Sequence, residues 1–317
     1  RTATTGESYF GEVAVDAGGN VYAAGNIAGS GRCDFGGGVT ATGTAENAAV
    51  LVKYDSSGMP QWARTVTAGN SVSRSYFYSV ATNAGGNVFA AGGSSIDGMG
   101  SFDFGENVKI TLRYGSGVLV KYDSSGAAQW ARTAAPRDPP SSTSFASVAV
   151  DAGGNVYAVG SIYGGYDYGT ATYDFGGGVT ATVTTPYAPV LVKYDSSGAP
   201  RWARTATSGN RSSSSGLRSV VVDAGGNVYA AGKLSGGSYD FGEGVTVTTS
   251  LAVVLVKYDS LGVPRWARTI IAGNRLSESH YLSVAADGGG NEYAAGYLFR
   301  EDSYDFGAGV TAAVTTP

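Results

Sequence analysis

Few residues in this chain could carry out chemistry alone. Its 317 residues include one histidine, His280, and one cysteine, Cys33. A Ser–His–Asp or Cys–His arrangement would have to use this single histidine, and zinc takes three or four nitrogen or sulfur ligands. A lone cysteine cannot form an intrachain disulfide. We therefore interpret His280 as an exposed residue of a variable loop and Cys33 as a small loop residue, with an intermolecular disulfide as the alternative for Cys33, and we predict no catalytic and no metal-binding residues.

Acidic residues recur at fixed places beside glycine or serine. Calcium could use them, because it binds several carboxylate and amide oxygens. Alternatively, each carboxylate accepts hydrogen bonds from its own turn. Asn83 replaces the first aspartate of the second repeat, which a turn tolerates better than a cation site does. We expect turns and no cofactor, with calcium as the alternative. The residues are Asp16, Asp151 and Asp223 in Gly-Gly-Asn turns, Asp55, Asp123, Asp195 and Asp259 in Ser-x-Gly turns, and Asp34, Asp103, Asp174, Asp240 and Asp305 before Phe-Gly.

Sugar chemistry would use other residues. Tyr163, Tyr166 and Tyr168 are candidates for stacking on a glycan, and Asn210-Arg211-Ser212 fits the N-glycosylation pattern. A glycosidase would need two carboxyl groups flanking the scissile bond. The repeated acids are already explained by turns, so we predict that the chain is not an enzyme. The acids outside those turns are assigned to variable loops: Glu7, Glu12, Glu46, Glu278, Glu301 and Asp302.

Composition argues against several classes of partner. Lys and Arg total 21 against 25 Asp and Glu, a net charge of −4, which disfavours nucleic acid and anionic membrane surfaces. No segment approaches the ~18 consecutive apolar residues of a membrane span, so we predict no membrane insertion. Hydrophobic residues make up 43% of the chain, enough for a core, and the 50 glycines do not follow a Gly-X-Y period.

The elements that position these residues are predicted to be β-hairpins. In Val190–Thr205 the residues alternate with the period of two that a strand requires, and Asp195 begins a turn. Pro200 then opens a second strand that carries Trp202 and Arg204 on one face. The same pattern recurs at Val50–Thr65, Val118–Thr133 and Val254–Thr269.

Another hairpin precedes each of these. Val13–Asp16 and Val21–Gly25 flank a Gly-Gly-Asn turn, a strong hairpin signal, and Ala3–Phe10 is expected to be a polar loop. Asp34–Gly38 follows, and the Thr/Val alternation of Val39–Thr42 predicts a further, more exposed strand. The turn asparagines recur at intervals of 67, 68, 72 and 64 residues: Asn20, Asn87, Asn155, Asn227 and Asn291.

The repeat has five Gly-Gly-Asn turns and five Asp-Phe-Gly turns, but only four hairpins with Lys-Tyr-Asp and Trp-Ala-Arg. Arg1-Thr2 match the ends of the Trp strands, and Val314–Pro317 match Val183–Pro186, which precede a hairpin. A hairpin of about 17 residues, like Tyr187–Ala203, is thus expected between the last unit and the first. The approximate units are 13–79, 80–147, 148–219, 220–283, and 284–317 with 1–12, in one domain, 1–317.

These patterns predict an all-β fold: a β-propeller of about five four-stranded blades of about 68 residues, with the last blade incomplete. An open β-solenoid or a sandwich array is the alternative. Lys53, Arg64 and their counterparts are expected to form a ladder with neighbouring Asp residues or with the Trp face. We expect the tryptophans in the core: Trp62, Trp130, Trp202 and Trp266.

The repeated segments resemble a known family. Val13–Gly25, Asp34–Gly38, Val50–Gly58 and Trp62–Arg64 look like the SBBP β-propeller repeats of bacterial surface and secreted proteins, and more distantly like NHL repeats. The resemblance covers the whole chain and implies a propeller and an extracellular or cell-surface location. It implies no particular activity, because such repeats are scaffolds without shared catalytic residues. The family name suggests seven blades, whereas five units are counted here.

The sequence favours a non-enzymatic extracellular scaffold. The absent hairpin would leave an open blade edge, and open edges pair with other strands. A hairpin from a neighbouring copy would build a homo-oligomer, filament or surface layer; one from the same polypeptide would complete the blade internally. A carbohydrate- or ligand-binding module is the second hypothesis, and a propeller glycosidase or lyase is the third. The sequence could also be part of a longer repeat chain.

Overall fold

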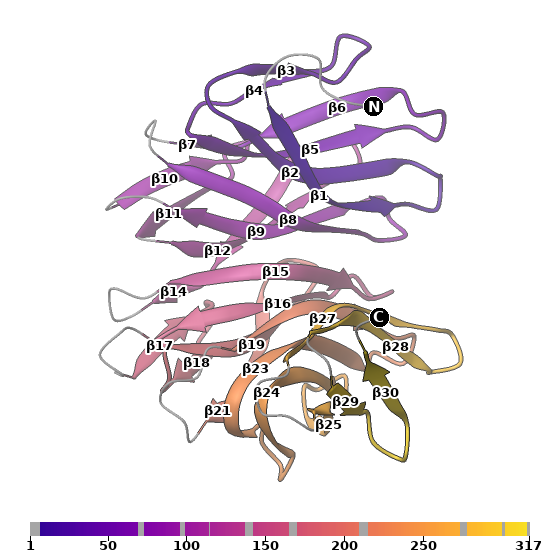
Figure 1. Cartoon of the computed structure of the whole chain (residues 1–317). Helices are drawn as coiled ribbons and strands as arrows, with labels where there is room; N and C mark the ends of the chain where they lie inside the picture. The colour runs from indigo at the N-terminus through magenta and orange to yellow at the C-terminus, as the bar shows by residue number, and fades with distance from the viewer. Residues whose placement is uncertain are drawn as a thin grey trace.

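The computed structural model describes residues 7–68, 73–95, 99–113, 115–136, 142–164, 170–208, 215–272, 278–299 and 302–315. All regular elements in these ranges are β-strands, which confirms the all-β prediction (Figure 1). The same ranges contain no helix long and apolar enough to cross a membrane.

Four successive segments each form an antiparallel sheet of four strands, and a fifth forms two. We call these units 1 to 5. One residue pair, Asn47 with Arg74, bridges the sheets of units 1 and 2. Unit 1 contains β1 (Ser8–Val15), β2 (Val21–Ala28), β5 (Asn47–Tyr54) and β6 (Pro60–Thr65); unit 2 contains β8 (Arg74–Thr82), β9 (Val88–Ser95), β12 (Ser116–Tyr122) and β13 (Ala128–Thr133); unit 3 contains β15 (Thr143–Val150), β16 (Val156–Tyr163), β19 (Tyr187–Tyr194) and β20 (Pro200–Thr205); unit 4 contains β22 (Gly216–Val222), β23 (Val228–Asp240), β24 (Thr246–Tyr258) and β25 (Pro264–Thr269); unit 5 contains β27 (Glu278–Ala286) and β28 (Glu292–Phe299).

The Asp-Phe-Gly segments form side hairpins between the second and third strands of a unit. The Thr-rich strand that we predicted is present, but it belongs to this side hairpin. A short strand from the end of one unit pairs with the side hairpin of the next, which ties consecutive units together. The hairpins are β3 (Arg32–Asp34) with β4 (Thr40–Thr42), β10 (Met99–Asp103) with β11 (Lys109–Arg113), β17 (Ala171–Asp174) with β18 (Thr180–Val183), β29 (Asp302–Asp305) with β30 (Thr311–Val314), and the far ends of β23 and β24; the short strands are β7 (Thr67–Ala68), β14 (Ala135–Pro136), β21 (Thr207–Ser208) and β26 (Ile271–Ala272).

The Val190–Thr205 hairpin has the predicted register. Val190 pairs with Thr205, Lys193 pairs with Trp202, and the register shifts between Lys193 and Tyr194. The predicted loop at Ala3–Phe10 was wrong in part, because β1 begins at Ser8.

The glycine in each second strand has a steric reason. The register of β15 shifts between Phe145 and Ser147, and this bulge brings the Ser144 carbonyl towards β16. A Cβ at Gly160 would lie 1.8 Å from the Ser144 carbonyl oxygen. Glycine therefore allows the second strand to approach the bulged first strand closely.

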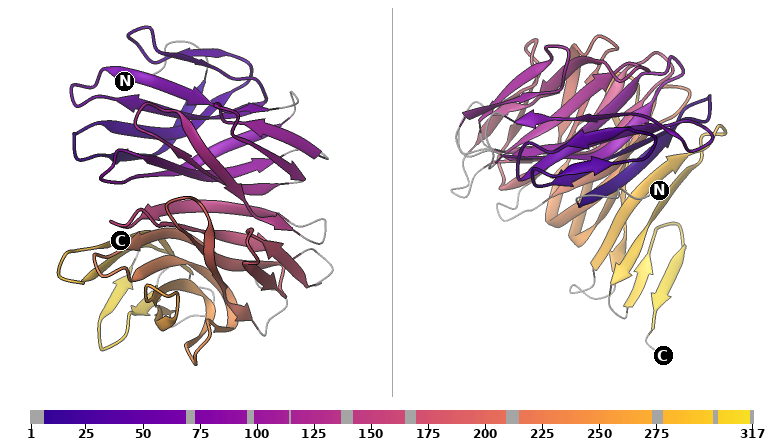
Figure 2. Two further views of the ribbon diagram at one scale, coloured as in Figure 1. Left: turned by 180° about the vertical axis from the view of Figure 1, so that it is seen from behind. Right: turned by 90° about the horizontal axis from the view of Figure 1, so that it is seen from above.

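The units lie side by side in chain order, and their first strands contact one another in the series β1, β8, β15, β22, β27 (Figure 2). The apolar cores lie between consecutive sheets: Tyr22 and Ala24 of unit 1 share one cluster with Phe77 and Val80 of unit 2. No sheet in the described part of the chain closes into a barrel. The fold is thus a curved series of packed sheets.

The prediction that all tryptophans lie in the core was correct for Trp130 and too strong for the others. Trp130 is 8% exposed. Trp62, Trp202 and Trp266 are half-buried. The indoles of Trp62 and Trp202 lie against a turn of the following unit, at Gly126 and Gly262.

Candidate functional site: the joint between units

The last strand of each unit holds a turn of the next unit. Between units 1 and 2, the Trp62 Nε1 donates to the Ser124 carbonyl at 3.3 Å. Arg64 donates from Nε to the Gly126 carbonyl at 2.7 Å and from Nη2 to the Ser125 carbonyl at 3.1 Å. Three carbonyl oxygens of one turn thus accept hydrogen bonds from the preceding unit. We call this contact the clamp.

The arginine and lysine contacts of the clamp recur at the next two joints, whereas the buried Trp130 Nε1 has no hydrogen-bond partner among the described residues at the second joint. Arg132 Nε donates to the Gly198 carbonyl and Arg204 Nε donates to the Gly262 carbonyl, both at 2.6 Å. Because a guanidinium is always charged and offers several fixed donors, it suits a turn with several outward-facing carbonyls. Each arginine also lies over the tryptophan two residues before it, with Arg64 Cζ 5.4 Å from the centroid of the Trp62 ring.

The turn glycine has two functions in the clamp. Gly126 has a φ of +81°, which L-residues with side chains adopt only with strain, and its missing Cβ leaves room for the indole of Trp62. A Cβ there would lie 2.9 Å from that indole, and a Cβ at Gly198 would lie 2.8 Å from Trp130. The turn and the joint therefore both require glycine at this position.

The lysines extend the clamp. Lys53 Nζ lies 5.4 Å from the Tyr22 ring centroid and donates to the Ser124 carbonyl of the next unit at 3.3 Å. The predicted contact with the Trp face is confirmed for Arg64, whereas Lys53 lies over Tyr22; the carbonyl partners of both residues in the next unit were not predicted. The aspartates of the Ser-x-Gly turns form ion pairs with Arg201 and Arg265 among the described residues, and not with the clamp arginines.

A second contact joins the first strands of consecutive units. The Val148 backbone N–H donates to Ser79 Oγ at 3.0 Å, and the Val284 N–H donates to Ser219 Oγ at 3.0 Å. At the first joint, a Glu12 carboxylate oxygen replaces the serine hydroxyl and accepts from the Val80 N–H at 3.0 Å. The placement of Glu12 in a variable loop was therefore wrong, since it is a β1 residue with a partner in unit 2.

The repeated aspartates hold their own turns, as predicted. Asp195 Oδ1 accepts from the Ser197 N–H at 2.9 Å, the Ser197 hydroxyl at 2.6 Å and the Ala199 N–H at 3.0 Å. Its Oδ2 lies 2.6 Å from Arg201 Nη2. The Ser197 hydroxyl, the turn N–H groups and Arg201 lower the pKa of Asp195 to about 2. These donors already occupy both carboxylate oxygens, so an Asx turn explains the residue without calcium.

The Gly-Gly-Asn turns are organised in the same way. Asp16 accepts from the Gly18 N–H at 2.9 Å, the Asn20 side chain at 2.8 Å and the Tyr22 hydroxyl at 3.0 Å. In the second repeat, Asn83 Oδ1 takes over the role of the aspartate and accepts from the Asn87 N–H at 3.0 Å.

Unit 1 exposes the face that the other units bury. Val13 is 59% exposed, whereas its counterparts Val80, Val148, Val220 and Val284 are 5–7% exposed. Beside Val13 lies a groove of about 380 Å³. Phe10, Val13, Val21, Ala23, Tyr54, Ser57 and Gly58 line it.

Unit 5 is open on its opposite face. Tyr293 is 58% exposed, although its counterparts Tyr22, Tyr157 and Tyr229 are 0% exposed. Arg268, the counterpart in unit 4 of the clamp arginines, is exposed, whereas Arg64, Arg132 and Arg204 are half-buried. Lys257 Nζ lies 3.8 Å from Glu292, and this glutamate stands where units 1 to 4 have valine. The acidic side chain occupies the region in which the other lysines meet turn carbonyls.

The remaining candidate residues have separate locations. His280 belongs to β27, where its backbone pairs with Tyr297, so its placement in a loop was wrong. Glu278 begins β27 and Asp302 begins β29, so they are strand residues as well. Glu7 lies just before β1. Glu46 pairs with Arg74 at 2.6 Å.

Cys33 and Tyr163 are buried. The loop assigned to Cys33 was wrong, because the residue lies in β3, and burial raises the pKa of its thiol. Tyr163 packs against Tyr187 with ring centroids 4.8 Å apart and is 7% exposed, which is unsuitable for glycan stacking. Tyr166, Tyr168, Glu301 and the Asn210–Ser212 sequon lie outside the described residues.

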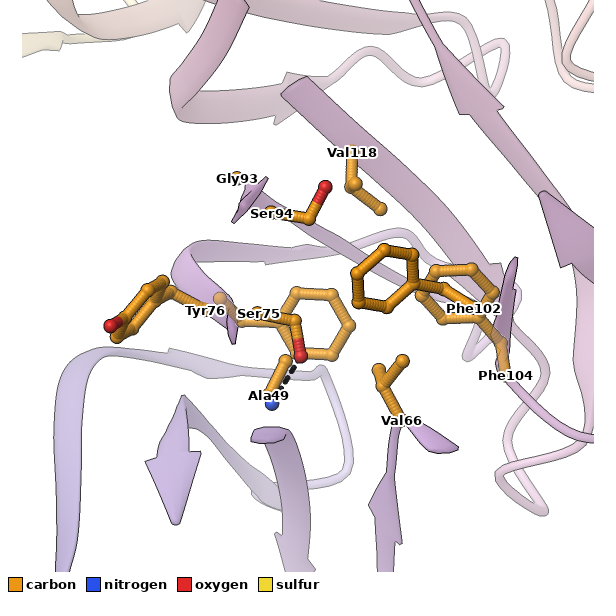
Figure 3. A pocket seen from close by; sticks show the side chains of 10 residues that line it. Ala49, Val66, Ser75, Tyr76, Gly93, Ser94, Phe102, Phe104 and Val118 are labelled. Carbon is orange, nitrogen blue, oxygen red and sulfur yellow. Dashed lines mark hydrogen bonds between the residues drawn. The ribbon is translucent and has the colours of Figure 1, made fainter. Parts of the chain in front are cut away.

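A small apolar space at the first joint offers no ligand site. Phe102, Phe104, Val66 and Val118 surround it, and Ser75 Oγ accepts a hydrogen bond from the Ala49 N–H at 2.9 Å (Figure 3). The gap between these side chains does not admit a water molecule. We therefore assign it to packing between units 1 and 2.

Comparisons of the sequence with protein-family models and with curated proteins gave no match.

Proposed function

We propose that this chain is a non-enzymatic structural scaffold, built as an incomplete β-propeller, that assembles with further copies through its open ends. One observation carries the proposal. The residues that make the joints inside the chain recur on its two terminal faces, where Val13 and Tyr293 are exposed. An apolar surface already shaped for a like unit is a ready association site.

The two open faces differ, and this determines the kind of assembly. One presents the groove of unit 1, and the other presents Tyr293 and the side of β28 that faces away from β27, where the described residues contain no further strand of the sheet. Contact between different faces of two copies is heterologous, and it continues into a filament or layer unless the rotation closes a ring. A hairpin from a neighbouring copy would pair with β28 and complete unit 5. An extracellular location is proposed on the resemblance to surface-protein repeats alone.

Light scattering after size exclusion, followed by negative-stain electron microscopy, tests this proposal. We expect the mass of the 317-residue chain to rise with concentration and to give regular filaments or layers. Val13→Asp should abolish association, because it places a charge in the joint face, whereas Leu261→Asp, at a 72% exposed turn residue of unit 4, should not. A chain that stays monomeric at every concentration, or equal association of both variants, would overturn the proposal.

A further inference from the structure

We infer that the groove of unit 1 is a receptor for a tryptophan–arginine strand: the Trp-Ala-Arg strand of an outer hairpin contributed by a second chain of the same repeat. The inference rests on the proposed function, in that it names the partner of one open end. It assigns that end a specific ligand chemistry, an indole beside a guanidinium.

The apolar half of the groove has a filled counterpart inside the molecule. Phe10, Val13, Val21, Ala23 and Tyr54 correspond to Phe77, Val80, Val88, Ala90 and Tyr122 of unit 2. All five unit 2 residues belong to one cluster with Tyr22, Ala24 and Leu51 of unit 1, and Trp62 packs against it. The same surface therefore binds an aromatic strand wherever a preceding unit is present.

The polar half of the groove presents the carbonyls of the Asp55–Gly58 turn. In the corresponding turn of unit 2, the carbonyls of Ser124, Ser125 and Gly126 accept hydrogen bonds from Trp62, Arg64 and Lys53. Asp55 and Gly58 form the same turn, with the Gly58 N–H donating to the Asp55 carbonyl at 2.8 Å. Since the turn geometry is the same, the guanidinium of an incoming strand has acceptors in matching positions, as Arg64, Arg132 and Arg204 have at the internal joints.

Gly58 keeps the space for an indole vacant. Its φ is +79°, similar to that of the clamped glycines, and a Cβ there would have no heavy atom of the described part of the chain within 4 Å. At Gly126, Gly198 and Gly262, by contrast, the same Cβ would meet an indole at 2.7–2.9 Å. A methyl group at position 58 would thus obstruct a docked tryptophan while touching nothing in the free chain.

A hairpin of the repeat's own sequence is the probe. A labelled, backbone-cyclised peptide spanning Val118–Thr133 carries Trp130 and Arg132 in the required order. Fluorescence anisotropy would measure its binding to the chain and to two groove variants, Gly58→Ala and Val13→Asp. Gly38→Ala is the matched control, because Gly38 has a φ of +80° and no heavy atom within 4 Å of its Cβ position. A Trp130→Ala peptide tests the ligand.

We expect Gly58→Ala and Val13→Asp to weaken binding at least about tenfold, Gly38→Ala to leave it unchanged, and the Trp130→Ala peptide to lose most of its affinity. Val13→Asp also serves if Gly58→Ala impairs folding, because Val13 is exposed in the free chain. The absence of saturable binding, or equal binding by the wild-type chain and Val13→Asp, would overturn the inference.

The two proposals can fail separately. If the chain self-associates but the groove variants bind the hairpin like the wild type, the scaffold function stands and the groove assignment is wrong. If the chain remains monomeric yet the hairpin binds in a manner sensitive to Gly58 and Trp130, the assembly proposal is wrong and the receptor stands.

Discussion

The joint between units 2 and 3 and the free face of unit 1 use equivalent residues in different surroundings. Val148 is 5% exposed and Val13 is 59% exposed. A Cβ at Gly198 would meet the indole of Trp130, whereas a Cβ at Gly58 would meet no heavy atom of the described residues within 4 Å. The strands and turns are the same in both places, so the difference comes from the neighbouring sheet. Burial in this fold is therefore a property of pairs of units, as expected of a repeat protein in which each unit packs on its neighbours.

The turns behave differently from the joints. The Tyr229 hydroxyl donates to Asp223 at 3.0 Å and the Tyr293 hydroxyl donates to Asp287 at 3.1 Å, although the first tyrosine is buried and the second exposed. The Gly-Gly-Asn turn thus forms in unit 5 as well, whose sheet has two strands among the described residues. Local hydrogen bonds fix the hairpins, and contacts between units then decide which surfaces are covered.

The largest expected effect comes from removing a clamped tryptophan. Trp130→Ala should lower the free energy of unfolding by about 3 to 5 kcal/mol, because it leaves a cavity between units 2 and 3. Trp266→Ala should cost about 1 to 2 kcal/mol, since this half-buried indole lacks a clamped turn among the described residues. Guanidinium denaturation of both variants measures the difference. Equal losses would mean that the joint adds no stability beyond the burial of each indole within its own unit.

Adding a methyl group to a turn glycine comes next. Gly198→Ala and Gly58→Ala both place a side chain at a φ near +80°, which costs about 1 to 2 kcal/mol. Gly198→Ala should cost about 1 to 3 kcal/mol more, because its Cβ would lie 2.8 Å from Trp130. The difference between the melting curves of the two variants isolates the joint from the backbone strain. A smaller loss for Gly198→Ala than for Gly58→Ala would contradict the clamp.

Acid should destabilise the turns in joints and at open ends alike. The pKa values of Asp195 in unit 3 and Asp287 in unit 5 are lowered to about 2 by their turn donors. A carboxyl group with a depressed folded-state pKa stabilises the fold above its unfolded value near 3.8, and this contribution is lost as the pH falls from about 4 to 2. Each exposed carboxylate contributes modestly.

Thermal unfolding between pH 5 and pH 2 measures this effect. The melting temperature of the wild-type chain should fall as the pH is lowered from 5 to 2. The melting temperature of the Asp195→Asn variant should be lower at pH 5 and should fall less steeply. A melting temperature that rises on acidification would contradict the assigned turn hydrogen bonds.

The sequence predicted the features that depend on short stretches of chain. The donors to Asp195 lie within six residues of it, at Ser197, Ala199 and Arg201. The turn could therefore be predicted from its own short stretch of sequence. The strands of Val190–Thr205 followed in the same way. These contacts form within one hairpin and do not depend on how the units are arranged.

The joint could not be predicted in the same way. Arg64 and Gly126 are separated by 62 residues, and the glycine already had a sufficient explanation in its positive φ. A signal was nevertheless present: each Trp-Ala-Arg is followed about one repeat later by a turn glycine, except for the last, Trp266–Arg268. His280 and Cys33 were misplaced because single residues carry no period, and only the pairing of β27 and β3 locates them in strands.

The smallest expected difference concerns the serine contacts between first strands. Ser79→Ala removes the acceptor of the Val148 N–H from a site that is 2% exposed, which should cost about 1 kcal/mol. Ser283→Ala changes the equivalent hydroxyl on the exposed face of unit 5 and should be nearly neutral, because water can replace it. Hydrogen exchange of the Val148 amide gives a local readout: it should accelerate in Ser79→Ala and stay unchanged in Ser283→Ala. Unchanged protection in both variants would show that the Ser79 hydroxyl adds nothing to the packing of the first strands, so that the clamp and the paired short strands hold the register between units 2 and 3.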